Sequence, residues 1–148
     1  MKKLLKLLPL LLIAVCFTVF TACGDNDDKY VDASELPADA KGFVSQYFPG
    51  ENIITVEKDH GEYEVRLSDG TKIDFTRSGE WKDVDAPTGK TIPGGFYPAA
   101  IDAYIATNMN GMGINEISKE RRGYDVELLN GLELIFSTDG TFLATDHA

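Results

Sequence analysis

The most informative feature of the chain is an internal duplication. Residues 37–85 align with residues 98–146 without a gap, at a constant offset of 61 positions. The identical pairs are mostly prolines, glycines and apolar residues, which define the backbone and the core. They include Pro37/Pro98, Gly50/Gly111, Tyr63/Tyr124, Val65/Val126, Gly70/Gly131 and Phe75/Phe136. The duplication therefore predicts two copies of one structural unit. It says much less about chemistry.

Each copy begins with a predicted helix, over residues 37–48 and 98–109. In the first helix, Phe43, Val44 and Tyr47 follow one another at the three- and four-residue spacing of an amphipathic helix. A proline suits the first turn of each helix, because its missing N–H would have no partner there. Pro49-Gly50 and Asn110-Gly111 are typical of helix ends.

Four strands are predicted after each helix. Apolar and polar residues alternate around turn signals such as Asn130-Gly131 and Asp139-Gly140, a pattern typical of β-hairpins. The first strand of each copy, 53–59 and 114–120, has apolar residues three positions apart, so we expect a β-bulge near its start. One copy of about 50 residues would be marginal alone. We therefore predict an α+β fold, in which two tandem helix-plus-four-strand antiparallel repeats form one curved sheet with the helices on one face.

The N-terminus predicts export. Residues 1–6 contain three lysines, residues 7–20 are nearly all apolar, and Cys23 follows Thr21-Ala22. This ending resembles the lipobox of bacterial lipoproteins, which makes Cys23 the predicted site of lipid attachment; secretion with cleavage nearby is the alternative. The expected division is a signal peptide (1–22), an acidic tether (23–35), repeat 1 (36–85), a linker (86–96) and repeat 2 (97–146).

Attachment through Cys23 has consequences for chemistry and location. Cys16 would leave with the signal peptide, so the exported domain would have no free thiol and no disulfide. The acidic stretch after Cys23 resembles the surface-export signal of Bacteroidetes-type lipoproteins, although a solvated spacer is an equal interpretation. We expect a cell-envelope lipoprotein, on the periplasmic face of the outer membrane or at the cell surface.

The chain is acidic, with 24 Asp and Glu against 14 Lys and Arg and a formal net charge of -10. Such a charge disfavours nucleic acid as a partner. It either favours cationic partners or serves only to keep the protein soluble.

Several motifs resemble those of the PepSY-like, putative β-lactamase-inhibitor-like family of small exported proteins. They are the helix start at Leu36-Pro37-Ala38, the strand from Tyr63 to Leu67, the turn at Gly70, Gly79-Glu80-Trp81, and their equivalents after Gly123. The resemblance covers nearly all of residues 36–146. It implies a fold like that of β-lactamase inhibitory protein, but it transfers neither inhibitory activity nor catalytic residues.

Enzyme motifs are weak in this sequence. His60 and His147 are far apart, which makes no zinc signature, and no nucleophile motif accompanies them. The carboxylates fall on predicted strand positions that face water, where we expect unperturbed pKa values. We predict no catalytic residue, no metal site and no cofactor.

The best functional candidate is the sheet face opposite the helices. We predict that it displays mostly charged residues with two apolar exceptions: Glu62, Glu64, Arg66, Lys72, Asp74, Asp125, Glu127, Leu129, Glu133 and Ile135. A half-solvated sheet is the plain interpretation, and a docking surface is the functional one. We expect a non-enzymatic binding module that recognises an envelope or extracellular protein or peptide. The alternative is a small-ligand or cation-binding periplasmic protein.

Overall fold

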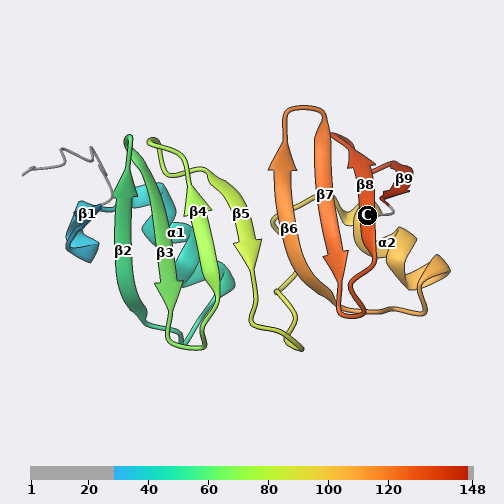
Figure 1. The fold of residues 1–148 in the computed structure, drawn as a ribbon, viewed down its shortest axis with the longest axis horizontal. Helices are drawn as coiled ribbons and strands as arrows, with labels where there is room; N and C mark the ends of the chain where they lie inside the picture. Colours follow the sequence, from blue (N-terminus) through green and yellow to red (C-terminus); the bar gives the residue numbers. More distant parts are fainter. Residues whose placement is uncertain (1–28, 147–148) are drawn as a thin grey trace, which may run out of the picture.

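The computed structural model describes residues 29–146, so Cys23, the predicted signal peptide and His147 lie outside the described residues. One open antiparallel sheet dominates the fold, and its nine strands are ordered as in the sequence (Figure 1). The strands are β1 (Lys29–Tyr30), β2 (Ile53–Asp59), β3 (Glu62–Leu67), β4 (Lys72–Phe75), β5 (Trp81–Asp85), β6 (Ile114–Glu120), β7 (Gly123–Leu128), β8 (Glu133–Ser137) and β9 (Phe142–Asp146). The predicted α+β class is confirmed.

Among the described residues, two α-helices, α1 (Ala38–Tyr47) and α2 (Ala99–Asn108), lie within the predicted ranges and cover one face of the sheet. In Figure 1, which looks onto the uncovered face, α1 lies behind β3 and β4. Pro37 and Pro98 are the N-cap residues. The chain reverses after α1 at Gly50, with a φ of 98° that glycine adopts without steric cost.

The core is a continuous layer between the helices and the sheet. The register places buried aliphatic side chains of successive strands directly opposite one another, in a row formed by Val56, Val65, Ile73, Val84, Ile117, Val126 and Leu134. Val44 of α1 and Ile105 of α2 belong to the same buried cluster. Alternation along each strand sends the neighbours of this row to the opposite face.

The expected bulges are present. The pairing of β2 with β3 shifts between Ile53 and Thr55, and that of β6 with β7 shifts between Ile114 and Glu116. The extra residue explains the three-residue spacing of the apolar positions, because it restores the inward direction of the following side chains.

The two halves of the sheet meet where β5 pairs with β6. Beneath this junction lies a cluster of rings in which Trp81 is central: its ring centroid is 5.0 Å from that of Phe96 and 6.1 Å from that of Tyr124. Phe96 also packs edge-on against Phe43 of α1, at 5.0 Å. The linker therefore contributes to the core and does more than connect the halves.

The C-terminal part of the segment predicted as a tether has regular structure. Part of it forms β1 and a 3-10 helix, η1 (Ala33–Glu35). The Val31 N–H donates to the Val56 carbonyl at 2.9 Å, and the Asp32 side chain accepts from the Ser34 N–H at 2.8 Å. Val31 also packs against the core, so this segment is held by apolar burial as well as by hydrogen bonds. Within residues 29–146, the helices are too short or too polar to cross a membrane.

Candidate binding face

The strand residues that point away from the helices form a surface that we call the open face. Cross-strand pairing arranges its acidic side chains in a line, which we call the acidic row: Glu57, Glu64, Asp74 and Asp83, followed by Ser118 and Asp125. Like charges directly opposite each other on neighbouring strands destabilise a sheet. The open face therefore holds unfavourable electrostatic energy that the core must offset.

A second line of residues runs beside the acidic row. Successive strands contribute Arg66, Lys72, Asp85, Glu116, Glu127 and Glu133 to it. The positive charges lie on β3 and β4, whereas β5 to β8 contribute only carboxylates. The acidity of this second line is therefore concentrated at the junction between the halves and beyond it.

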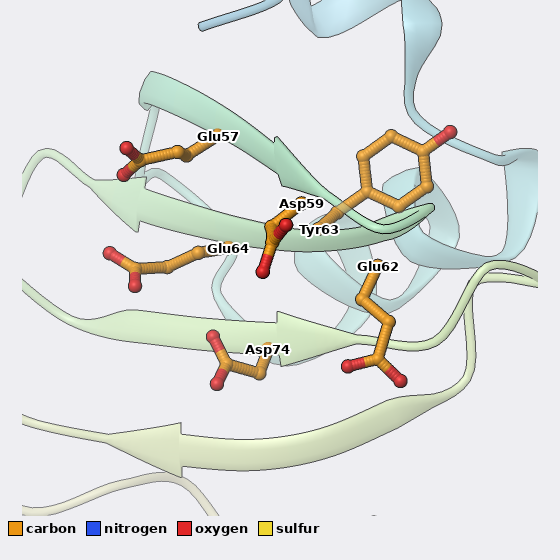
Figure 2. Close-up of a pocket in the computed structure, with 6 residues that line it drawn as sticks. All are labelled: Glu57, Asp59, Glu62, Tyr63, Glu64 and Asp74. Carbon is orange, nitrogen blue, oxygen red and sulfur yellow. The ribbon is translucent and has the colours of Figure 1, made fainter. Parts of the chain in front are cut away.

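The acidic row borders a shallow hollow of about 280 Å³ over β2, β3 and β4. Figure 2 shows the five carboxylate side chains that line it, from Glu57, Asp59, Glu62, Glu64 and Asp74. The sixth lining residue, Tyr63, directs its ring away from these carboxylates, consistent with its burial in the core. The hollow is thus a concentration of negative charge above an apolar layer.

Crowding changes the acidity of several of these groups. Burial, with Asp83 and Glu64 nearby, raises the pKa of Asp74 from 3.8 to about 6. Burial and four neighbouring carboxylates, of which Asp83 and Asp85 contribute most, raise the pKa of Glu116 from 4.5 to about 7. Desolvation and like charge both disfavour the ionised form of an acid. The expectation of unperturbed carboxylates is therefore wrong for these two residues.

Asp83 and Asp125 follow the same trend. Burial is the main cause that raises the pKa of each carboxyl. For Asp83 the Ser118 hydroxyl opposes this rise, because it donates a hydrogen bond to Asp83 Oδ1 at 2.5 Å across the junction.

Lysines offset only part of the charge. Lys82 Nζ lies 2.6 Å from Glu62 Oε2, and Lys72 Nζ lies 3.9 Å from Asp85 Oδ2. These lysines belong to the first half of the sheet. At the positions 61 residues later, Lys82 is replaced by Leu143, which is 58% exposed, and Lys72 is replaced by Glu133.

Nine of the ten residues predicted for this face lie in β3, β4, β7 and β8. Leu129 differs: it lies in the turn after β7, with its N–H donating to the Gly113 carbonyl at 3.0 Å, and it is 42% exposed. Leu129 was predicted to lie on the sheet face with the alternating strand residues, but β7 ends at Leu128. Ile135 lies within β8, opposite Asp125 on one side and Ala144 on the other.

Sequence reasoning missed the acids that β2, β5 and β6 contribute, above all Glu57, Asp83 and Glu116. A signal was available in β2, where Glu57 follows the inward-facing Val56. For Asp83 and Glu116 the decisive fact is the pairing of β5 with β6, which no local pattern reveals.

Among residues 29–146, no group of three or more His, Cys, Asp or Glu side chains is arranged to hold a metal ion. His60 lies at the tip between β2 and β3, with Nδ1 against the Asp59 carboxylate. Its side chain is 73% exposed.

Comparison with protein families gives a match over residues 24–70 and 61–144, to the family described as "Putative beta-lactamase-inhibitor-like, PepSY-like". A search of curated proteins finds no significant match.

Solved structures with the same fold come from Bacteroides. A "putative periplasmic protein of unknown function" from Bacteroides vulgatus ATCC 8482 is 32% identical, with a TM-score of 0.75 over 81% of this chain and 99% of that one. A "putative calcium-regulated periplasmic protein" from Bacteroides thetaiotaomicron is 28% identical, with a TM-score of 0.76 over 84% of this chain and 100% of that one.

Proposed function

The chain belongs to the PepSY-like, beta-lactamase-inhibitor-like family, and we propose that it is a non-enzymatic binding module of the cell envelope. Its ligand is a basic protein or peptide, which it captures on the open face. Two comparisons support this assignment: the family is described as inhibitor-like, and the similar solved structures are described as periplasmic proteins. The proposal includes lipid attachment at Cys23, which would hold the module at a membrane surface.

One observation carries the proposal. The acidic row crosses the junction between the halves, and it contains carboxyls whose pKa values are raised, to about 6 for Asp74. A partner with positive charges would relieve this repulsion, because an opposite charge favours the ionised form. The energy that the free protein loses to crowded carboxylates would thus be recovered on binding.

The second half of the sheet supplies apolar area next to this charge. Ile135 and Ala144 continue the acidic row across β8 and β9, and Leu143 is exposed beside them. Protein interfaces commonly combine an apolar centre with a polar rim. A basic partner with an apolar segment would fit both parts of the open face.

We also infer that the chain is a tandem duplication whose copies have diverged in function. Each helix is followed by four strands, at the offset that relates the two sequences. Core positions such as Val65 and Val126 are the same in both copies, whereas Lys82 and Leu143 differ. The divergence at the open face gives it one lysine-containing end and one apolar end.

Binding of a defined basic peptide to the full-length protein tests the proposal. Fluorescence anisotropy at pH 7.5 would follow the binding of a labelled peptide that alternates Lys and Val. The double variant Asp74→Asn/Glu116→Gln should bind this peptide about tenfold more weakly, a loss of about 1.4 kcal/mol in binding free energy. The control Glu35→Gln/Glu80→Gln removes the same charge from exposed positions outside the strands. Equal weakening by both variants, or equal binding of an acidic peptide, would reject docking on this face.

Calcium is the competing ligand. The Bacteroides thetaiotaomicron neighbour is described as calcium-regulated, and carboxylates are oxygen ligands that Ca²⁺ accepts. Calorimetry with CaCl2 separates the alternatives: heat from a saturable site that Asp74→Asn abolishes would favour the cation, whereas salt-like screening without saturation would leave the peptide proposal.

A further inference from the structure

The sheet carries a second feature, away from the open face. An open groove of about 710 Å³ lies between α1, η1 and the start of β2. Val44 and Phe48 of the helix side and Ile53 of β2 provide its apolar lining, and Ser45 lies at its exposed rim.

The same place in the second half is partly filled by the linker. There the remaining cavity is about 370 Å³, and its lining includes Ile105 and Ile114, which occupy the positions equivalent to Val44 and Ile53. The linker places Ile92 against this cavity, where only 7% of the side chain remains exposed. Ile92 thus shows that a groove of this shape can accept an isoleucine side chain from an extended segment.

The linker also pairs with the strand edge. The N–H of Ala86 donates to the Asn115 carbonyl at 3.0 Å, and the N–H of Ile92 donates to the Ile114 carbonyl at 2.9 Å. The carbonyls at the equivalent positions of β2 belong to Ile53 and Ile54.

No segment among residues 29–146 pairs with this part of β2. β1 and Val31 cover the edge of β2 only from Lys58 to Val56. From Thr55 back to Ile53 the edge has no paired strand among the described residues, and an unpaired edge next to apolar surface is a template for an added strand.

One difference between the two halves points to an apolar occupant for this groove. Asn115 holds the linker through its side-chain amide, which donates to the carbonyls of Ala86 and Lys90 at 3.0 and 2.8 Å. The equivalent residue in β2 is Ile54, which is 59% exposed. An isoleucine side chain cannot donate hydrogen bonds to carbonyl groups. An apolar neighbour would stabilise it, and the described residues do not supply one.

We propose that this groove binds an extended segment of a partner protein that carries β-branched aliphatic residues. The segment pairs with the Ile53–Thr55 edge of β2 as an added strand, a recognised mode of peptide capture. One aliphatic side chain enters the groove between Val44 and Ile53, as Ile92 does in the other half, and the next apolar residue covers Ile54. This site is separate from the open face and does not depend on its charge.

The test uses the full-length protein and two labelled peptides of equal charge. The probe is Gly-Lys-Thr-Ile-Thr-Ile-Lys-Gly, and in its control both Ile residues are Ser. We expect saturable binding of the probe and at least about tenfold weaker binding of the control. Ser45→Trp, which fills the groove from an exposed helix position, should weaken the probe by a similar factor.

Ala106→Trp is the matched control, because Ala106 is the exposed equivalent of Ser45 in α2. It should leave the affinity within about twofold. The open-face variant Asp74→Asn/Glu116→Gln should leave the affinity for the probe within about twofold, which separates the two surfaces. Absence of probe binding, equal affinity for both peptides, or insensitivity to Ser45→Trp overturns the proposal. Dimerisation that Ser45→Trp abolishes and the probe does not inhibit would assign the groove to a second copy instead.

Discussion

Replacing Glu116 by Gln should stabilise the protein at alkaline pH. Burial and the neighbouring carboxylates raise the pKa of Glu116 to about 7 from 4.5. The folded state therefore retains a proton that the unfolded chain releases between these pH values. Stability from this group is fully present below pH 4.5 and is lost as the pH rises through 7.

The magnitude follows from the size of this change. Each pH unit of pKa difference corresponds to about 1.36 kcal/mol, which would give about 3 kcal/mol without screening. Because the Glu116 side chain is only partly buried, water and salt reduce this penalty to about 1 kcal/mol. Glutamine has nearly the same shape without the charge. Glu116→Gln should thus raise the free energy of unfolding by about 1 kcal/mol at pH 8, and by much less at pH 4.5.

Urea denaturation at pH 4.5 and pH 8 measures this difference, with fluorescence of Trp81, the single tryptophan, as the signal. Glu80→Gln is the control, since this exposed residue lies in a turn outside the crowded rows. The reasoning fails if Glu116→Gln is no more stable than the wild type at pH 8, or if the gain is equally large at pH 4.5.

Three further outcomes follow from the packing. Gly42→Ala should raise the free energy of unfolding by about 0.5–1 kcal/mol in urea titrations, because Gly42 is an exposed position in α1 with no atom within 4 Å of the added methyl. Trp81→Ala should lower the free energy of unfolding by about 2–3 kcal/mol, measured by circular dichroism, because contacts with Phe43, Phe96 and Tyr124 are lost. A loss below about 0.5 kcal/mol would contradict a shared core between the halves. Ile135→Lys should leave the thermal unfolding midpoint within a few degrees but prevent capture of an apolar basic partner on the open face, and unchanged pull-down of that partner would argue against this part of the surface.

Local patterns predicted the elements well. The proline and glycine positions indicated where α1 and α2 begin and end, because both residues act on the backbone at their own position. The spacing of Ile53 and Val56 predicted a bulge, which the register confirms. In each case the information lies within a few residues of the feature that it determines.

The open face was predicted less completely. Alternation correctly assigned Glu64 and Asp74 to it, because a strand sends successive side chains to opposite sides. Leu129 was assigned to the sheet face, but the strand before it ends one residue earlier. The strand β1 and the 3-10 helix η1 were missed, since elements of two or three residues leave no periodic signal.

The duplicated pattern of apolar residues, glycines and prolines determined by itself that the chain folds into hairpins over two helices, because backbone preference and the side-chain direction are local properties. Only the tertiary structure decided which carboxylates become neighbours. Asp83 and Glu116 are separated by a linker and a helix, and the pairing of β5 with β6 brings them together. The raised pKa values of these two carboxyls depend on desolvation and on partners distant in sequence. Both conditions arise only when the whole sheet is assembled, and so does the unpaired edge of β2.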